Sequence, residues 1–296
     1  MSIKTKIQWT DSTVNPTVGC DGCELWNEKQ KICYAGKMTK RFGKSNPGLA
    51  DRFEEVDTRP GKMADAAGWS DQTRKPRWTK SWLHDLPRLI FVGDMADNFS
   101  AAISFEYLHD EVIAAATSEK GQRHQWQWLT KQPRRMAKFS KWLSSEGIVW
   151  PNNLWVGTSV TTQSTLKRID HLHRVGDETT LHFVSVEPQW EYIELGRHLE
   201  KLDWVIQGGE SDSMKHPFDL AWAESLQKEC RKARVPYFLK QLGTHVVSDG
   251  QRVKLVDKHG ENWREWPEQL CVRQMPIYVG RRPGGRRVRR RNVELE

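Results

Sequence analysis

Six short apolar runs occur between residues 88 and 243, and each run leads into polar residues. They read RLIFVGDMAD, QWQWLTKQP, NLWVGTSV, LHFVSVEP, LDWVIQGGE and PYFLKQLG. Apolar runs of this length, without strict alternation, are typical of strands that are buried on both faces of a parallel sheet. The pattern therefore predicts a series of buried strands in this part of the chain.

Amphipathic stretches separate these runs, and they are long enough to cross over as helices. The predicted helices cover residues 104–120, 133–145, 162–175 and 219–235. Alternating strands and helices are typical of an α/β protein with a parallel sheet. So many successive units favour a full or partial β/α barrel over a doubly wound sheet.

The chain outside these units is less regular. Residues 36–87 carry glycine, proline and basic residues, which predicts an insertion acting as a lid or a substrate loop. Residues 244–279 show alternating patches and a turn at Asp249 and Gly250, which predicts a small β extension. We therefore expect a barrel over residues 1–243, an extension over 244–279 and a tail over 280–296.

The basic charge is concentrated in that tail. Residues 280–296 hold seven arginines and two glutamates, a net of +5 out of the formal +8 of the whole chain. With two glycines, a proline and an arginine run, the tail has no apolar face to bury, so it is predicted to be disordered and able to lie on phosphates. A solvated tail without a specific partner is the alternative.

The ends of the predicted strands carry most of the candidate chemistry. A β/α barrel places its active site at the carboxyl ends of its strands, because the helices cover the sides. A single polar residue there can simply meet water, but convergence of several on one face favours a site. These ends hold Asp94, Asp97, Thr130, Lys131, Thr158, Ser159, Glu187, Gly208, Gly209, Glu210, Lys240 and Gln241.

Three of the five cysteines lie in one stretch, VGCDGCELWNEKQKICYA at residues 18–35. Cys20, Cys23 and Cys33 have the spacing C-x2-C-x9-C, whereas Cys230 and Cys271 lie far along the chain. Thiolates are soft ligands that suit zinc and iron–sulfur clusters. Cys230 falls within a helical pattern and is predicted to be a small buried residue.

Spacing alone leaves three interpretations of the cysteines open. An iron–sulfur cubane with three protein ligands keeps one iron open for another ligand. Zinc bound by the three cysteines and His84, or another distant residue, fits equally well. A redox pair at Cys20 and Cys23 is a third interpretation, although no thioredoxin-like βαβ pattern surrounds it. The position of the stretch before the first long β/α unit favours a cluster at the barrel mouth.

A three-cysteine loop after the first strand of a β/α barrel resembles the radical SAM superfamily. More closely, NPTVGC…CYA, IFVGDMAD, WLTKQPRRM, LWVGTSV…RI, FVSVEP, DWVIQGGES and PYFLKQLG resemble a phage-encoded three-Cys-motif family of unknown function that is radical SAM-like. The resemblance runs from about Trp9 to Gly243. The spacing departs from the usual C-x3-C-x2-C motif of the superfamily.

The resemblance implies a fold and a chemistry. It implies a radical SAM barrel whose [4Fe–4S] cluster reductively cleaves S-adenosylmethionine to give a 5′-deoxyadenosyl radical, with the cofactors carrying the difficult chemistry. It implies that Cys20, Cys23 and Cys33 bind the cluster. The cofactor-binding residues expected from their positions are Tyr34, Asp94, Ser159, Glu187, Gly208, Gly209 and Glu210. The expected catalytic residues are Lys131, Lys240 and Gln241.

A nucleobase or nucleotide is the predicted substrate, as in phage DNA hypermodification, because the tail, the segment RKPRWTK and the phage-like family all favour phosphate contacts. The alternative is a non-catalytic nucleic-acid-binding protein stabilised by zinc or an iron–sulfur cluster. The chain shows no signal peptide and no membrane span, so we expect a cytoplasmic protein, in the host cytoplasm if phage-encoded, that uses an external electron donor.

Overall fold

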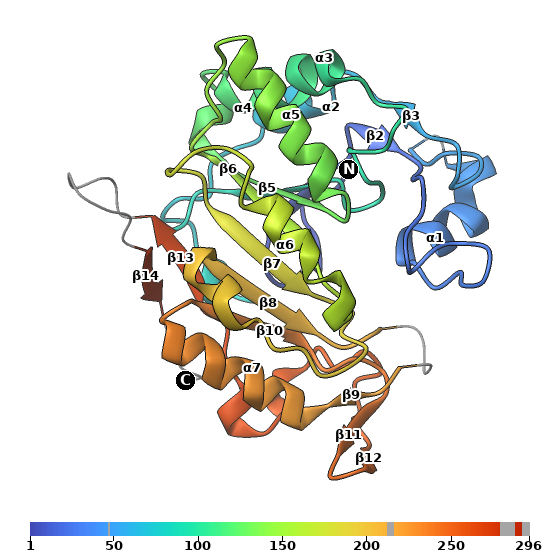
Figure 1. Ribbon diagram of the computed structural model, residues 1–296, viewed down its shortest axis with the longest axis vertical. Coiled ribbons are helices and arrows are strands. Elements are labelled where there is room, and N and C mark those ends of the chain that lie inside the picture. Colours follow the sequence, from blue (N-terminus) through green and yellow to red (C-terminus); the bar gives the residue numbers. More distant parts are fainter. Residues whose placement is uncertain (47, 212–215, 279–287, 292–296) are drawn as a thin grey trace. The chain divides into compact units, whose positions relative to one another are not determined.

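The computed structural model describes residues 1–46, 48–211, 216–278 and 288–291 (Figure 1). Its largest sheet has seven strands in the order β1-β4-β5-β6-β7-β8-β10. Their bounds are β1 Ser12–Val14, β4 Leu89–Val92, β5 Gln125–Thr130, β6 Leu154–Ser159, β7 His182–Val186, β8 Trp204–Gly208 and β10 Tyr237–Gln241.

The order of the strands in this sheet follows their order along the chain. The pairs β1–β4, β4–β5, β7–β8 and β8–β10 are parallel. A doubly wound sheet reverses its direction of winding part-way, whereas a barrel adds each strand beside the previous one. The prediction of an α/β fold with partial-barrel winding is confirmed at this level, and every predicted run forms a strand.

The chain divides into two compact units. Unit 1 comprises residues 1–76, 84–157 and 174–180, and unit 2 comprises residues 77–83, 158–173 and 181–296. Strands β1, β4 and β5 belong to unit 1, and β7, β8 and β10 belong to unit 2, while β6 crosses the boundary.

Unit 1 holds two further short strands and most of the helices that lie early in the chain. Their bounds are β2 Thr17–Val18, β3 Asp57–Thr58, α1 Tyr34–Phe42, α2 Lys62–Ala67, α3 Phe105–Leu108, a π-helical turn His109–Ile113, α4 Ala114–Thr117, α5 Pro133–Ser145, and 3-10 turns Gly43–Ser45 and Gly121–Arg123.

The helix predicted over residues 104–120 forms, with a π-helical turn in its middle. Ser104 caps its start by accepting the Tyr107 amide at 3.1 Å. The π-helical turn carries Glu111, whose carboxylate accepts the amides of Gly61 and Met63, both at 2.8 Å. Since a negative group favours a helix N-terminus, Glu111 anchors the start of α2.

Helix α5 matches its predicted range of 133–145. It begins with Pro133 in the first turn, where proline costs no hydrogen bond. Phe139, on its buried face, packs against Phe99 and Trp128 with ring centroids 6.0 Å away in each case. Figure 1 shows α5 beside β5 and β6.

Unit 2 combines its sheet strands with the C-terminal part of the chain. Its other elements are the 3-10 turns Ser81–Leu83, Gln163–Thr165, Gly196–Lys201, Trp263–Glu265 and Glu268–Leu270, the helices α6 Lys167–Leu172 and α7 Leu220–Ala233, and the strands β9 Phe218–Asp219, β11 Val246–Ser248, β12 Gln251–Val253, β13 Met275–Tyr278 and β14 Val288–Arg291.

The two helices predicted in unit 2 agree with the structure to different extents. Helix α7 agrees with its prediction, since the Asp219 carboxylate caps the Ala221 amide at 2.9 Å. The helix predicted over 162–175 is shorter, because Gln163–Thr165 is a 3-10 turn and α6 ends at Leu172. Ser and Thr hydroxyls compete with helical bonds for the backbone, and the Thr165 hydroxyl accepts the Thr161 amide at 3.0 Å.

The turn predicted at Asp249 and Gly250 is confirmed. Strands β11 and β12 pair antiparallel with Ser248 opposite Gln251. Asp249 and Gly250 have φ angles of 51° and 74°, so both central residues of this two-residue turn are left-handed. Such turns match the twist of a hairpin.

Part of the basic tail departs from the predicted disorder. Strand β14 pairs antiparallel with β13, with Met275 opposite Arg291. Backbone pairing of this kind needs no apolar side chains, which explains how a charged segment can form a strand. The remaining tail residues lie outside the described residues.

The buried residues agree with the sequence pattern. Trp126, Trp128, Trp155 and Trp204 are each at most 2% exposed, and Cys230 is fully buried, as predicted. Burial of large aromatic rings contributes strongly to folding. None of the described helices is long and apolar enough to cross a membrane.

Candidate metal and cofactor site

The first cysteine follows the end of β1 through a short antiparallel pair, β2 with β3. Gly19 precedes it with φ 77°, and a Cβ atom there would lie 2.1 Å from the Glu55 carbonyl oxygen. Only glycine avoids both the overlap and the backbone strain. The Cys20 amide then donates to the Phe53 carbonyl at 2.7 Å, which fixes the start of the cysteine loop.

The nine-residue gap between Cys23 and Cys33 is closed by backbone hydrogen bonds. Cys23 and Trp26 exchange two amide–carbonyl bonds of 3.0 Å. The Leu25 carbonyl then accepts the amides of Ile32 and Cys33, at 2.9 and 3.0 Å. The gap therefore folds back on itself, and Cys33 lies beside the residue that follows Cys23 by two positions.

The three sulfur atoms share one environment. Trp26, Phe53 and Cys20 form a buried cluster, and Cys33 packs against it. Backbone amides donate to two sulfurs, Gly22 to Cys20 Sγ and Leu25 to Cys23 Sγ, each at 3.4 Å. Hydrogen bonds of this type stabilise the thiolate form and tune metal–sulfur sites.

Burial opposes ionisation of these thiols. Burial and then the charge of Asp97 raise the pKa of Cys20 to about 12. Burial also raises the pKa of Cys23, and the Lys131 ammonium group opposes that rise. A thiol of raised pKa keeps its proton at neutral pH, so a metal must displace protons when it binds.

The donor set suits a soft metal. Three thiols within electrostatic range of one another, with amide donors to two of them, match the ligand chemistry of zinc and of iron–sulfur clusters. Within the described residues, no three His, Cys, Asp or Glu side chains are already arranged as a metal-holding group. The role of Cys20, Cys23 and Cys33 as metal ligands stays a prediction.

Lys131 lies at the end of β5, beside this loop. Its amide donates to the Asp97 carboxylate at 2.9 Å, and the Thr130 hydroxyl donates to the same side chain at 2.7 Å. Asp97 is buried, and burial raises its pKa. The carboxyl group thus holds the strand end that carries Lys131, the cation whose charge acts on Cys23.

Asp94 and Tyr34 occupy different surroundings. The Asp94 carboxylate accepts a hydrogen bond from the side-chain amide of Asn15 at 2.7 Å. The side-chain oxygen of Asn15, Oδ1, accepts the Met95 backbone amide at 3.0 Å. The bond to Asn15 ties this carboxyl group to the end of β1. Burial raises the pKa of Asp94. Tyr34 begins α1 directly after Cys33, and its residue is 57% exposed.

Asp21 is a residue of the cysteine loop that the sequence did not single out. Its carboxylate accepts the Ala101 amide at 2.6 Å and the side-chain amide of Gln132 at 3.3 Å. Because Gln132 follows β5, Asp21 ties the cysteine loop to that strand end. Its place between two cysteines was the only available signal.

Unit 2 presents a second group of polar residues at the ends of β7, β8 and β10. Lys240 donates through Nζ to the Glu187 carboxylate in a short hydrogen bond. The side chains are 17% and 16% exposed, so the ion pair is largely withdrawn from water. Two predicted site residues are thus brought together as partners, an arrangement that holds a lysine in one position.

Contacts within the chain explain why residue 209 is a glycine. A Cβ atom at Gly209 would lie 2.1 Å from the Leu242 carbonyl oxygen, whereas one at Gly208 would only touch Glu187 and Gln241 side chains at 3.4 Å. Gln241 is 1% exposed, and its side-chain amide donates to the Gly209 carbonyl at 3.0 Å. These contacts join the ends of β8 and β10.

Ser159 lies at the end of β6 and is buried. Its carbonyl accepts a guanidinium nitrogen of Arg168 at 3.1 Å. The next residue, Val160, donates its amide to the Ser185 carbonyl at 2.9 Å. Ser159 is therefore held in the sheet by backbone contacts on its carboxyl side.

Glu210 has partners that sequence reasoning missed. Its Oε2 accepts Nε1–H of Trp190 at 3.0 Å and pairs with Nδ1 of His216 at 2.7 Å. The rings of Trp190 and His216 stack, with centroids 4.4 Å apart and planes at 19°. His216 comes six residues after Glu210 and Trp190 twenty before it, a separation that gives no local pattern.

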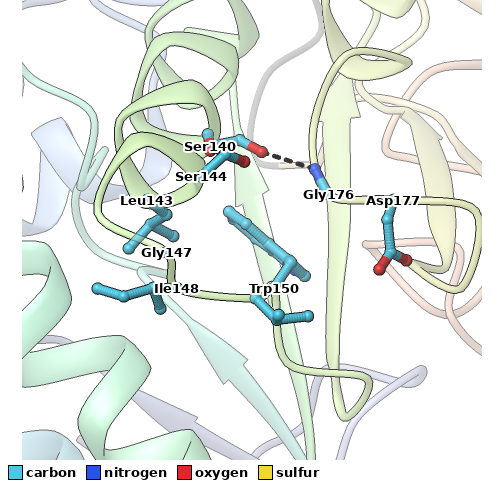
Figure 2. A pocket seen from close by; sticks show the side chains of 9 residues that line it. Ser140, Leu143, Ser144, Gly147, Ile148, Trp150, Gly176 and Asp177 are labelled. Carbon is cyan, nitrogen blue, oxygen red and sulfur yellow. Dashed lines mark hydrogen bonds between the residues drawn. The ribbon is translucent and has the colours of Figure 1, made fainter.

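A cavity of about 320 Å³ lies elsewhere in unit 1 (Figure 2). It is formed by the end of α5, the loop before β6 and the turn at Gly176, which donates to the Ser140 hydroxyl at 2.8 Å. This loop precedes the amino end of β6. The cavity is therefore not part of the strand-end groups, and its lining includes no cysteine, histidine or lysine.

Comparison with known families gives one match. A family model described as protein of unknown function (DUF5131) matches residues 4–285. The chain belongs to the DUF5131 family. Searches of curated proteins and of solved structures each found no match.

Proposed function

We propose that this DUF5131 protein is a radical SAM enzyme whose cysteine loop holds a [4Fe–4S] cluster. The observation that supports this most directly is the closure of the nine-residue gap. The Leu25 carbonyl accepts the Ile32 and Cys33 amides, so the gap folds back on itself and Cys33 lies near Leu25 despite the nine intervening residues, which supports a shared cluster. The loop also follows β1, the first strand of a barrel-type sheet, where an active site is expected.

The chain's own residues would hold and tune the cluster. Cys20, Cys23 and Cys33 are the ligands, and the Gly22 and Leu25 amides stabilise two of the thiolates. Such a cluster, with S-adenosylmethionine on its open iron, supplies reductive cleavage to a 5′-deoxyadenosyl radical. Three thiolates on one site repel one another, and the nearby Lys131 ammonium offsets part of that repulsion.

The proposal keeps the residue roles predicted from the sequence, with Glu187, Gly208, Gly209 and Glu210 as cofactor-binding residues and Lys131, Lys240 and Gln241 as catalytic residues. Carboxylates such as Glu187 and Glu210 accept hydrogen bonds from an ammonium group or from ribose hydroxyls. Lys240, already oriented by Glu187, is the cation that a phosphate or carboxylate would meet. Tyr34, Asp94 and Ser159 keep the binding roles predicted from the sequence.

The test is anaerobic reconstitution of the full chain with iron and sulfide. We expect about four iron and four sulfide ions per chain. After reduction, S-adenosylmethionine should yield 5′-deoxyadenosine, measured by mass spectrometry. Cys33→Ala should lose both properties. Cys271→Ala is the matched control, because Cys271 is a partly buried thiol that bonds to the Trp263 carbonyl outside the loop, and it should keep both.

The alternative is a non-catalytic, zinc-stabilised nucleic-acid-binding protein. It predicts about one zinc ion per chain bound by the same three thiols, and no 5′-deoxyadenosine. That result, with a Cys33→Ala variant that loses zinc, would refute the radical SAM proposal. It would leave the cysteine loop as a structural metal site.

We further propose a nucleobase or nucleotide as the substrate. Trp78 is 86% exposed and lies in the basic segment RKPRWTK. A tryptophan that exposed contributes little to the core, and its ring suits stacking on an unpaired base while lysine and arginine contact phosphate. In this proposal the protein acts in the cytoplasm with an external electron donor.

Binding of a labelled single-stranded oligonucleotide at low salt tests the substrate class. Trp78→Ala should weaken binding by about 1 to 3 kcal/mol, the usual contribution of one stacked base. Tyr192→Ala is the control, because Tyr192 is an exposed aromatic residue, 51% accessible, outside the basic segment. Equal affinities of the two variants and the parent chain would contradict the proposed role of Trp78.

A further inference from the structure

The contacts of Glu210 join three side chains that all belong to unit 2. The Glu210 side chain is only 5% exposed, and its Oε2 atom has two partners, Trp190 Nε1 and His216 Nδ1. The indole nitrogen can only donate. Oε2 therefore acts as an acceptor toward Trp190, as an ionised carboxylate does.

The same contact bears on which nitrogen of His216 carries hydrogen. An ionised carboxylate can only accept hydrogen bonds, so the hydrogen of the 2.7 Å contact is assigned to Nδ1. In the neutral ring, Nε2 is then the nitrogen with the free electron pair. Among the described residues, Nε2 has no hydrogen-bond partner, and the His216 side chain is 27% exposed.

The surroundings restrict the ring to this orientation. The Trp190 indole lies against the imidazole with planes only 19° apart, and it anchors the same carboxylate through Nε1. The Glu210 backbone is held in turn, since its carbonyl accepts the Thr244 amide at 2.9 Å. A buried carboxylate that orients a partly exposed histidine is the arrangement found in general acid–base catalysis.

We propose that His216 transfers protons to and from a bound substrate, with Glu210 and Trp190 as its positioning residues. Nε2 takes a proton from an N–H or O–H group of the substrate, whose electron pair stays on that atom. The imidazolium that forms is paired with the Glu210 carboxylate, so the net charge of the pair goes from −1 to zero while the deprotonated substrate carries the negative charge. The reverse transfer returns the proton to the product.

The ligand class follows from this chemistry. It is a neutral molecule with an acidic N–H or O–H group, such as the ring N–H of a pyrimidine or a sugar hydroxyl. All three residues belong to unit 2, whereas the cysteines belong to unit 1. The inference therefore does not need the cluster, and it can be tested on protein that contains no metal.

The first measurement is the tautomer of His216, by ring nitrogen chemical shifts in protein labelled with 15N-histidine. We expect the form with hydrogen on Nδ1, the less common one in free histidine. Assignment uses His216→Gln, which removes a single set of signals. Glu210→Gln should increase the fraction of His216 in the Nε2–H tautomer, and Trp190→Phe should increase that fraction to a smaller extent. An Nε2–H tautomer in the parent chain would overturn the proposal.

The second measurement is the reactivity of Nε2 toward diethyl pyrocarbonate, followed residue by residue with mass spectrometry. Nε2 attacks a carbonyl carbon and monoethyl carbonate leaves as an anion. The Nδ1 proton of the ring passes through Glu210 to this leaving group, which breaks down to carbon dioxide and ethanol. His259 is the exposed reference histidine. Glu210→Gln should slow modification of His216 by about tenfold, the usual effect of losing an orienting carboxylate, and leave His259 unchanged.

The two readouts separate a proton-transfer role from a merely structural one. A structural pair would predict that Glu210→Gln lowers stability without a selective effect on His216 reactivity. Should that variant fail to fold, Trp190→Phe gives the same comparison with the ring retained. A rate at His216 that does not change relative to His259 overturns the inference, whatever the outcome of the cluster experiment.

Discussion

The two units place different chemistry at equivalent positions, the carboxyl ends of parallel strands. In unit 1, the half-buried Asp94 and the buried Asp97 accept bonds from amides and a hydroxyl. In unit 2, Glu187 and Glu210 contact a lysine and a histidine. The strand ends of unit 1 are thus held by neutral donors, and those of unit 2 by ionisable partners.

This difference distinguishes the structural carboxyl groups of unit 1 from the ionisable pairs of unit 2. Burial raises the pKa of Asp94 and of Asp97, and the charge of Asp97 acts on Cys20 in the cysteine loop of unit 1. In unit 2, the side chains of Lys240 and His216 are 17% and 27% exposed, so both are partly buried and paired with a carboxylate. We infer that unit 1 is built to hold thiols and unit 2 to handle polar groups and protons.

The largest expected effect tests how tightly the strand ends of unit 2 are joined. Gly209→Ala puts a Cβ atom 2.1 Å from the Leu242 carbonyl oxygen and should cost about 3 kcal/mol of unfolding free energy. Gly208→Ala meets only side chains at 3.4 Å and should change stability by less than about 1 kcal/mol. Urea unfolding of both variants decides, and equal losses would contradict this account of Gly209.

The next effect compares one ion pair from each unit. Lys240→Gln leaves a Glu187 side chain that is 16% exposed without its cation, so we expect a loss of about 2 kcal/mol. Lys31→Gln, in unit 1, breaks a pair with Glu54 whose side chains are 45% and 48% exposed, and it should cost about 0.5 kcal/mol. If thermal or urea unfolding finds the two losses alike, the distinction between the units is wrong.

The thiols of unit 1 predict a dependence of stability on pH in the metal-free protein. Cys20 has its pKa raised from 9.0 to about 12, so the folded chain keeps a proton that the unfolded chain loses above about pH 9. Stability should therefore fall as pH rises through this window, by at most about 1.4 kcal/mol per pH unit. Urea unfolding between about pH 8 and pH 10 should show a shallower fall in Cys20→Ala.

The smallest expected effect concerns the cation beside the cysteine loop. Lys131 lowers the pKa of Cys23 against the effect of burial, so Lys131→Gln should slow alkylation of Cys23 by about threefold near pH 8. Lys138→Gln is the control, because Lys138 is an exposed lysine of the helix that follows. Peptide mass spectrometry gives the rate at each cysteine, and similar rates in both variants would place Lys131 outside the site.

Much of the fold could be predicted from local pattern. The buried runs became strands because an apolar segment of five or six residues can satisfy its backbone only in a sheet. Helix α5 has a proline start and an amphipathic face, and the turn at Asp249 and Gly250 needs residues that tolerate positive φ. These signals act within a few residues, so they can be read along the chain.

The candidate site was predictable only in part. The strand ends and the cysteines could be named, but their partners could not. Glu187 meets Lys240 across 53 residues, and Asp97 meets Lys131 across 34. His216 and Trp190 carry no spacing signal, and Asp21 was hidden between two cysteines. Contacts across such distances depend on which strand ends become neighbours.

The sequence by itself determined that this chain forms successive buried strands with helical crossovers, that polar residues follow each strand and that three thiols share one loop. Only the tertiary structure decided how the nine-residue gap closes, why Gly209 must lack a Cβ atom and which side chains meet His216. The physical reason is the separation along the chain over which each kind of interaction acts. Hydrophobic periodicity and turn chemistry act over a few residues, whereas hydrogen bonds between strand ends exist only after the sheet has brought distant segments together.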